Sequence, residues 1–496
     1  MDCQLVHICD CIPARIRHAL AELPKTLDET YERTLGGINE ANWEFAHRMF
    51  QFVSVASRPL HVSELADLLA FNFEAESESI PEFYEEWRLE DPVEAVLSTC
   101  STLLAIVDDQ GSPIIQFSHF SVKEFLTSTR LSKATESKSR YHVSMTPAHT
   151  LAARACFGIL LHLDKDVTTD SLKDLPLAEY AAEHWVDHTR FKDVSRKVED
   201  GMKQLFDPNK LHLATCVWIY DPTVPTSKRR NETPLPLPQT TLHYAAFWGL
   251  HPIVDFLITK HSQDVCSRDS TDNATPLHLA SEIGRIDTAR MLIERGADLA
   301  AQNKDGETPL HLAVRKGEVD VARMLFECGA DITARNKDGE TPLHLASQKG
   351  EEEIARMLIE RGADLTAQNK NGETPLHLAL QKREVDVARM FIKRGADLTA
   401  QNKDGETPLH LASRNGEVDV VRMLIERGAD LTTQNEYGEA PIHLALQMGE
   451  VDIVRILLSA RQPGIMRRVS DFEPSARLYD RLHDRLHDRS CACLSF

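Results

Sequence analysis

No apolar run in this sequence is long enough to cross a bilayer. A membrane helix needs about 18–20 consecutive apolar residues, whereas here the apolar 42% is spread along the chain. The first residues, Met-Asp-Cys-Gln, also lack the basic and apolar segments of a secretory signal. Ten cysteines scattered over 496 residues are typical of reduced thiols rather than of a disulfide framework. We therefore expect a cytoplasmic protein, with several domains because of its length.

Positive charge is scarce in the first part of the chain. Residues 1–100 carry 19 acidic and 7 basic side chains, and the formal net charge of the whole protein is −20. Nucleic-acid binding needs clustered Lys and Arg to neutralise phosphates. We therefore expect neither a nucleic-acid partner nor a membrane partner.

A period of 33 residues dominates the second half of the sequence. The motif Thr-Pro-Leu-His-Leu-Ala begins at Thr275 and returns four times at this interval, and variants begin at Thr240 and Ala440. A single unit of this size cannot bury its apolar face, so such units stack into a solenoid. The motif and its period resemble those of ankyrin repeats. The resemblance implies seven helix pairs joined by projecting fingers, and a role in protein binding.

The residues of one unit fit this expectation. Asp305-Gly306 predicts a tight turn, because Gly tolerates positive φ. Thr308 is predicted to cap the free N–H groups of the first helix with its hydroxyl, and Pro309 suits the first helical position. A second helix is predicted over residues 319–326, and Gly329 is expected to end it in the left-handed conformation.

The motif histidine occurs in all seven units: His243, His278, His311, His344, His377, His410 and His443. A metal array is one reading of this series. The resemblance to ankyrin repeats instead implies that each imidazole lies inside the turn and bridges hydroxyl and backbone groups. We expect no metal, no cofactor and no catalytic residue in this half of the chain.

In ankyrin proteins a partner meets the concave face, which consists of the finger tips and the first helix of each unit. The resemblance assigns these helix positions: Phe247, Trp248, Glu282, Ile283, Arg315, Lys316, Gln348, Lys349, Gln381, Lys382, Arg414, Asn415, Gln447 and Met448. The fingers add an acidic edge of Asp305/Glu307, Asp338/Glu340, Asn371/Glu373 and Asp404/Glu406. Trp and Arg are enriched at binding hot spots. The alternatives are a solvated, salt-bridged face and a Trp248 packed against the preceding domain.

The first half predicts helices followed by a hairpin. Apolar residues at helical spacing predict helices over 12–40, 42–56 and 62–69. Residues 103–107 and 114–117 flank a turn signal and predict a hairpin. Ser121-Val-Lys-Glu124 matches a capping box that would open another helix. Together these elements favour a winged-helix module over residues 41–135.

Four segments carry a second resemblance: Leu23–Tyr31, Arg58–Leu65, Phe117–Leu126 and Tyr180–His188. They are similar to the region after the NACHT domain in fungal NACHT–ankyrin proteins, which are NLR-like (STAND) signalling ATPases. The winged-helix part also resembles one named after GPI inositol-deacylase, without implying that activity. The resemblance covers residues 1 to about 222. The phosphate loop that such ATPases need, G-x-x-x-x-G-K-[S/T], is absent from the sequence.

Three histidines of the first half could carry chemistry. The resemblance implies that His119 contacts a nucleotide phosphate, but the chain has no phosphate loop to complete that site, which favours a structural histidine. His184 and His188 lie one helical turn apart and could form a metal pair. They lack the glutamate of H-E-x-x-H and an evident third ligand, so a structural helix face is the preferred reading.

The sequence therefore predicts a mainly α protein. Its expected segments are a helical stretch 1–40, a winged helix 41–135, a helical domain 140–222, a linker 223–239, seven ankyrin repeats 240–461 and a disordered tail 462–496. The tail offers a kinase-type motif at Ser470 and a prenylation alternative at Cys493.

The expected function is a non-enzymatic, monomeric scaffold for a protein partner of unknown identity. The alternative is the sensor half of an NLR-like signalling ATPase whose NACHT domain is missing from this chain. Oligomerisation is expected only if an NTPase is supplied.

Overall fold

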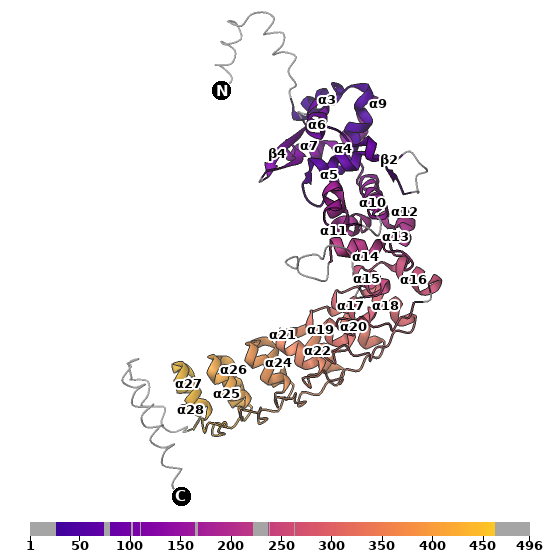
Figure 1. The fold of residues 1–496 in the computed structure, drawn as a ribbon. Helices are drawn as coiled ribbons and strands as arrows, with labels where there is room; N and C mark the ends of the chain where they lie inside the picture. Colours follow the sequence, from indigo (N-terminus) through magenta and orange to yellow (C-terminus); the bar gives the residue numbers. More distant parts are fainter. Residues whose placement is uncertain are drawn as a thin grey trace, which may run out of the picture. The chain divides into compact units, whose positions relative to one another are not determined.

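The computed structural model describes residues 26–73, 80–100, 103–109, 111–163, 167–221, 237, 239–261 and 263–461. Its contacts divide the chain into two compact units, Met1–Leu237 and Pro238–Phe496 (Figure 1). The predicted linker lies almost entirely outside the described residues. The predicted tail, with Ser470 and Cys493, lies outside them as well.

The first unit opens with a helix-and-hairpin module. Its elements are α3 (Leu27–Gly36), η1 (Glu40–Asn42), α4 (Trp43–Val55), β1 (Leu60–His61), α5 (Val62–Leu69), β2 (Phe71–Asn72), β3 (Glu82–Phe83), η2 (Glu85–Trp87), α6 (Pro92–Cys100), β4 (Leu104–Asp109) and β5 (Ser112–Phe117). Strands β4 and β5 form the predicted hairpin, and β1 adds to β5 to give the antiparallel order β1-β5-β4. Met49 and Phe52 of α4 are buried, as their spacing predicts. The order of helices and hairpin confirms the winged-helix expectation.

The predicted capping box at Ser121 is wrong. Helix α7 (Phe120–Leu126) begins two residues earlier than the motif implies, and His119 is its N-cap. The Nδ1 atom of His119 accepts the backbone N–H of Ser121 at 3.3 Å. The hydroxyl of Ser121 bonds the same imidazole at 2.6 Å and the Tyr31 hydroxyl at 2.8 Å. Ser121 therefore links α7 to α3 instead of opening a helix.

The rest of the first unit is helical. It comprises α8 (Thr129–Ser132), α9 (Glu136–Ser139), α10 (Met145–His162), η3 (Ser171–Asp174), α11 (Leu177–Thr189), α12 (Val194–Lys197), α13 (Glu199–Leu205) and α14 (His212–Ile219). Helix α10 packs against α4, α11 and α13. The fully buried Trp185 contacts the rings of Phe157 and Phe206, with centroids 5.5 and 6.1 Å away.

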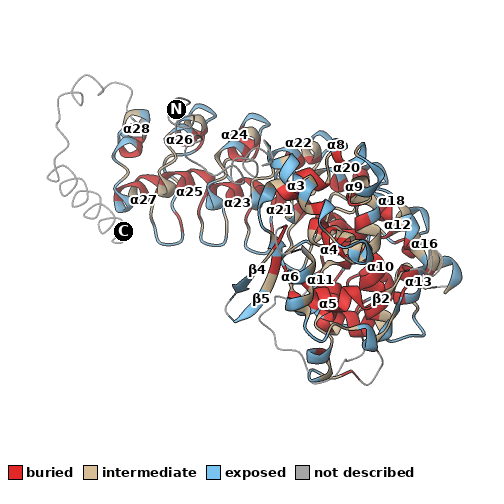
Figure 2. Cartoon of the chain, turned by 90° about the horizontal axis from the view of Figure 1, so that it is seen from above, coloured by how far each residue is buried: buried red, intermediate tan, exposed pale blue. Residues whose placement is uncertain are grey.

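The second unit is a curved solenoid of helix pairs (Figure 1). The described residues contain seven pairs: α15 (Thr241–Trp248) and α16 (His251–Lys260), α17 (Pro276–Glu282) and α18 (Ile286–Glu294), α19 (Pro309–Arg315) and α20 (Val319–Glu327), α21 (Pro342–Lys349) and α22 (Glu352–Glu360), α23 (Pro375–Lys382) and α24 (Val385–Lys393), α25 (Pro408–Asn415) and α26 (Val418–Glu426), α27 (Pro441–Met448) and α28 (Val451–Arg461). We call the odd-numbered helices inner and the even-numbered helices outer. Buried residues lie where neighbouring helices meet, and the finger loops project as exposed strips (Figure 2). Gly329 adopts φ 89° after α20, as predicted.

A buried imidazole joins each repeat to the next. In the central repeat the Nδ1 atom of His344 lies 3.1 Å from the Thr341 nitrogen and 2.9 Å from the Thr341 hydroxyl. Its Nε2 atom lies 3.1 Å from the Glu373 carbonyl oxygen in the following finger. Because Nδ1 accepts from a backbone N–H, Nε2 must carry the proton and donate to this carbonyl. The implied bridging role of the motif histidine is therefore confirmed.

The same arrangement recurs along the array. The Nε2 atoms of His278, His311, His377 and His410 reach the carbonyl oxygen 29 residues ahead at 3.0–3.2 Å. Thr308 is the N-cap residue of α19, as predicted, and its hydroxyl also lies 2.8 Å from the Nδ1 atom of His311. The single lone pair of Nδ1 therefore lies beside both the backbone N–H and the hydroxyl of the same threonine.

These imidazoles make stability dependent on pH. Burial lowers the pKa of His278, His311 and His344 to about 4, against about 6.5 in an unfolded chain. The folded state therefore binds fewer protons, and its stability is lost as pH falls below 6.5. At pH 5 each of the three is expected to cost about 2 kcal/mol. We predict that the urea midpoint for unfolding of the second unit decreases when the pH is lowered from 7.5 to 5. Amide hydrogen exchange in the full chain measures this midpoint.

The finger glutamates act in the opposite direction, because burial raises the pKa of Glu307, Glu340 and Glu406. These glutamates gain protons more readily in the folded than in the unfolded state, which offsets part of the stability lost through the histidines as the pH falls. If the urea midpoint stays constant or rises when the pH is lowered from 7.5 to 5, the claim that the buried imidazoles are neutral in the folded state is contradicted.

Candidate partner-binding surface

The predicted partner-binding positions differ in accessibility. Of the fourteen, only Trp248 is buried, with 7% of its surface exposed, and the others are half-buried or exposed. The Trp248 ring packs on Tyr244 and Phe247, with centroids 5.7 and 6.4 Å away. This leaves Trp248 little area with which to contact a partner.

The predicted acidic edge is only partly correct. Asp305, Asp338 and Asp404 are exposed at the finger tips, but Glu307, Glu373 and Glu406 are at least 92% buried. The reason is a second hydrogen-bond network inside each finger. The side-chain oxygen of Asn369, for example, accepts the backbone N–H of Glu373, and its amide donates to the Glu373 carboxylate at 2.9 Å.

The inner helices reach back to these fingers. Arg315 donates to both carboxylate oxygens of Glu307 at 2.9 Å, and Arg414 donates to Glu406 at 2.7 Å. Both arginine charges are therefore balanced by a carboxylate of the same repeat. Gln447 makes the equivalent bond to Glu439 at 2.6 Å.

The lysines at the ends of the inner helices have different surroundings. The ammonium of Lys316 lies 3.1 Å from a carboxylate oxygen of Glu282. Lys349 and Lys382 are exposed, and neither forms an ion pair with any residue that the structure describes. They are the uncompensated cations among the predicted positions.

Exposed large hydrophobic side chains gather in the last repeat, where Tyr437, Met448, Val451 and Leu458 are all exposed. Tyr437, on the finger, is 77% exposed, and Met448, at the end of α27, is 53% exposed. Met448 was predicted, but Tyr437 was missed. The signal for Tyr437 was present in the sequence, because the equivalent position holds Asp305, Asp338, Asn371 and Asp404 in the preceding repeats.

Arg383 is the second residue that the sequence prediction missed. It ends α23 with φ 65°, in the left-handed region that glycine occupies at this position in the other six repeats. Its guanidinium donates to the Asn415 carbonyl oxygen at 2.5 Å. In the preceding repeat the carboxylate of Glu384 packs over Gly350, where a Cβ atom would clash with it. Near Arg383 the corresponding Glu417 is half-buried, and burial raises its pKa.

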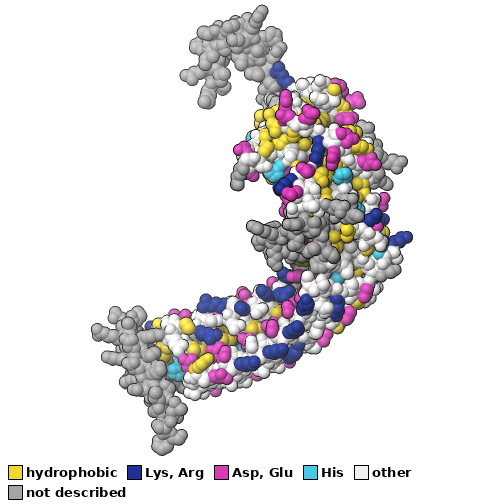
Figure 3. Space-filling model, viewed as in Figure 1, with side chains coloured by type: hydrophobic (Ala, Val, Ile, Leu, Met, Phe, Trp, Pro, Cys, Tyr) yellow, Lys and Arg dark blue, Asp and Glu magenta, His cyan; other side chains and the backbone are white. Residues whose placement is uncertain are grey.

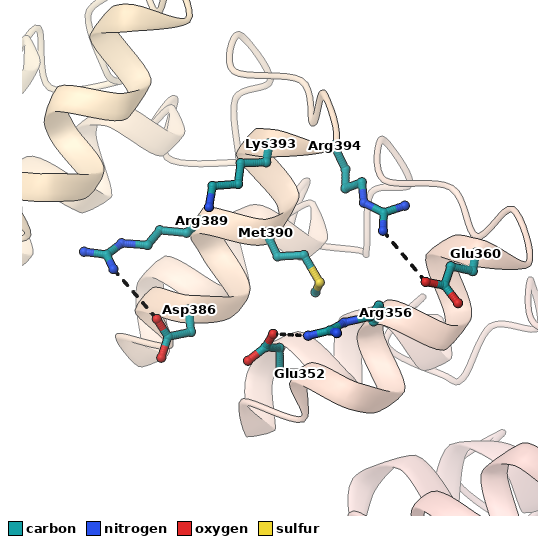
Figure 4. Close-up of a pocket in the computed structure, with 8 residues that line it drawn as sticks. All are labelled: Glu352, Arg356, Glu360, Asp386, Arg389, Met390, Lys393 and Arg394. Atoms are coloured by element: carbon teal, nitrogen blue, oxygen red, sulfur yellow. Dashed lines mark hydrogen bonds and ion pairs between the residues drawn. The ribbon is translucent and has the colours of Figure 1, made fainter.

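The outer helices α22 and α24 enclose a shallow groove of about 490 Å³ (Figure 4). Three of its cations have acidic partners: Arg356 with Glu352, Arg389 with Asp386 at 3.9 Å and Arg394 with Glu360 at 3.8 Å. Lys393 forms no ion pair among the described residues. Because the charges in the groove are mostly balanced, it is a weaker candidate than the inner surface.

The three histidines of the first unit have structural partners. His119 is exposed and serves as the N-cap of α7. His188 is fully buried between Tyr180, at 2.9 Å, and His149, at 3.1 Å, and burial lowers its pKa to about 3. His184 turns to Asp187 instead, at 3.0 Å, so the two motif imidazoles do not converge.

The described part of the chain contains no group of three or more His, Cys, Asp and Glu side chains that could hold a metal ion. Within the same residues, none of the helices has the length and apolar character to span a bilayer.

Family comparisons agree with both halves of the fold. Residues 242–336, 328–402 and 394–467 match the family described as ankyrin repeats (3 copies), and residues 31–137 match the GPI inositol-deacylase winged helix domain. The "Azaphilone pigments biosynthesis cluster protein L" of Monascus ruber is 29% identical over 296 residues. The match covers 56% of this chain and 61% of that protein.

Two solved structures are also similar. The ankyrin repeat domain of Bcl-3, a member of the IkappaB family, is 32% identical with a TM-score of 0.40, and covers 44% of this chain and 98% of its own. The human ASB11 ankyrin repeat domain is 26% identical with a TM-score of 0.40, and covers 45% and 98%.

The strain at Arg383 predicts a stabilising substitution. A non-glycine residue in the left-handed region costs about 1 kcal/mol relative to glycine. Arg383→Gly is therefore expected to raise the free energy of unfolding by about 1 kcal/mol, even though it loses one exposed hydrogen bond. Urea denaturation followed by circular dichroism measures the change.

Gly350→Arg is the reverse exchange in the preceding repeat and serves as the control. It should lower stability, because the new side chain is strained and displaces Glu384. If Arg383→Gly destabilises the protein as much as Gly350→Arg does, the strain argument is refuted.

Proposed function

We propose that this chain, in which residues 242–467 match the ankyrin-repeat family, is a non-enzymatic scaffold that binds a protein on the concave face of its solenoid. One observation carries the proposal: hydrogen bonds hold the interior of each repeat, whereas its inner surface is exposed to solvent. Imidazole and finger networks satisfy polar groups at the helix starts and in the fingers, whereas Lys349, Gln381, Lys382 and Met448 remain exposed. Interaction through a rigid, exposed surface is how repeat proteins bind their partners.

The charges of the solenoid favour a protein partner over nucleic acid. Lys and Arg side chains are interspersed with Asp and Glu over the visible face of the repeats (Figure 3). Arg315 and Arg414 are neutralised by buried carboxylates. A phosphate backbone needs a continuous cationic track, whereas a protein segment can match alternating charges and apolar contacts.

A second proposal concerns the first unit. The winged-helix match at residues 31–137 supports a role as the sensor or regulatory part of an NLR-like signalling ATPase. The phosphate loop is absent from the sequence, so nucleotide hydrolysis would have to come from another polypeptide or segment. His119 is exposed and therefore accessible to such a domain.

This role is tested by measuring the binding of a separately expressed NACHT domain to the chain. We expect the double substitution His119→Ala and Phe120→Ala to abolish that binding.

The scaffold proposal predicts that inner-surface substitutions remove binding. We expect full-length protein carrying Arg315→Ala, Lys316→Ala, Gln348→Ala and Lys349→Ala to lose its partners about tenfold or more, because hot-spot truncations cost at least about 1–2 kcal/mol each. The measurement is affinity capture followed by quantitative mass spectrometry.

The matched control changes four outer-helix residues, Arg290, Arg323, Arg422 and Arg455, to alanine, and should retain the partners. Thermal unfolding confirms that both variants fold. Equal capture by the inner-surface variant and the unchanged protein rejects the concave-face assignment.

A further inference from the structure

One repeat of the solenoid differs from all its neighbours in charge. The repeat of residues 370–402 has six Lys and Arg against four Asp and Glu. The five complete 33-residue units from Thr271 to Asn435 have these formal net charges in chain order: −2, −1, −3, +2 and −2. A positive repeat therefore stands inside an acidic array, in a protein of net charge −20.

Three substitutions at repeat positions produce this difference. Asn371 replaces the finger aspartate, Arg383 replaces glycine, and Lys393 replaces the glutamate present at 294, 327, 360 and 426. Each makes the repeat more positive by one or two charges. They lie at the finger, at the end of the inner helix and on the outer helix, so no single structural contact requires all three.

Arg383 is the substitution that works against stability. It adopts the strained backbone that the other repeats give to glycine, and it leaves no glycine surface for Glu417 to pack on. Strained residues persist where function compensates for their cost. The guanidinium is exposed at the surface beside Lys382, and Lys349 stands at the end of the adjacent inner helix α21.

Positive charges outnumber negative charges around Lys349, Lys382 and Arg383. Two acids lie nearby: the carboxylate of Glu384 packs over Gly350, next to Lys349 in the chain, and Glu417 interacts electrostatically with Arg383. Both side chains are half-buried, and two acids balance at most two of the three cations. Asn415, at the end of α25, is neutral and donates to the Leu380 carbonyl oxygen at 2.5 Å. Elsewhere on the inner surface, Arg315, Lys316 and Arg414 are already paired with acids.

We propose that Lys349, Lys382 and Arg383 form the docking position for a short acidic segment of the protein partner. The inference rests on the proposed scaffold function and names the chemistry of its ligand. A cluster of Glu or Asp side chains on the partner would pair with the three cations at the edge of the concave face. A nucleic acid fits less well, because the repeats on either side are acidic and would repel a longer phosphate chain.

The test uses the full chain and a fluorescein-labelled peptide, Gly-Ser-Glu-Glu-Asp-Glu-Glu-Ser-Gly. Binding is followed by fluorescence anisotropy at 20 and 150 mM NaCl. We expect saturable binding that weakens with salt. We further expect Arg383→Gly and Lys382→Gln each to weaken it about threefold to tenfold, the effect of one well-placed charge. Arg383→Gly is informative because it should weaken binding while stabilising the fold, so unfolding cannot explain the loss.

Lys393→Gln is the matched control: it removes one positive charge from the same repeat on its outer side and should leave peptide affinity unchanged. The proposal is overturned if the peptide does not bind, if Lys393→Gln weakens it as much as Arg383→Gly, or if decathymidylate binds more tightly than the peptide. These failures are distinct from failure of the scaffold, because partner capture by Arg315 and Lys316 can persist when the acidic peptide does not bind.

Discussion

The structure of the second unit depends on one repeated interaction, the hydrogen bond from a buried imidazole to the finger of the next repeat. A helix pair of this size has one apolar face and cannot shelter it alone. Stacking solves that problem but buries the polar backbone of the finger, which then needs partners. The imidazole provides them: Nδ1 satisfies the start of its own helix, and Nε2 satisfies the carbonyl 29 residues later. Apolar stacking and polar satisfaction are thus achieved by the same contact.

Because apolar stacking and the imidazole hydrogen bonds stabilise the interior, the exposed positions of each repeat can vary in sequence. The interior motif is nearly identical in five repeats, whereas the ends of the inner helices change from Ile283 through Lys316 and Lys349 to Met448. Arg383 shows how far the variation extends, because there the backbone itself is strained. A surface that departs from the repeat pattern at a cost in stability is the best guide to where a partner binds.

The fold was largely readable from the sequence because both signals are local. The 33-residue period and the Gly, Pro and Thr positions define each helix pair, and the apolar spacing and turn signal define α4, α5 and the β4–β5 hairpin. One capping prediction is confirmed and one is wrong. Thr308 is the N-cap of α19, whereas Ser121 resembles an N-cap in sequence but lies inside α7, where its hydroxyl bonds His119, the actual N-cap, and sequence spacing does not show which bond is formed. Likewise, Glu307 and Trp248 look like surface residues until packing buries them.

The central account is tested most directly by removing one imidazole from the middle of the array and, separately, only the hydroxyl that it contacts. The Nδ1 atom of His344 lies beside the backbone nitrogen and the hydroxyl of Thr341, and its Nε2 atom bonds the Glu373 carbonyl oxygen in the next repeat. The free energy of unfolding should fall by about 3 kcal/mol in His344→Ala, which loses all of these contacts, and by about 1 kcal/mol in Thr341→Ala, which keeps the bond to Glu373, since each buried hydrogen bond contributes about 1 kcal/mol. Equal losses in the two variants would contradict the account, because the contact between repeats would then contribute nothing of its own.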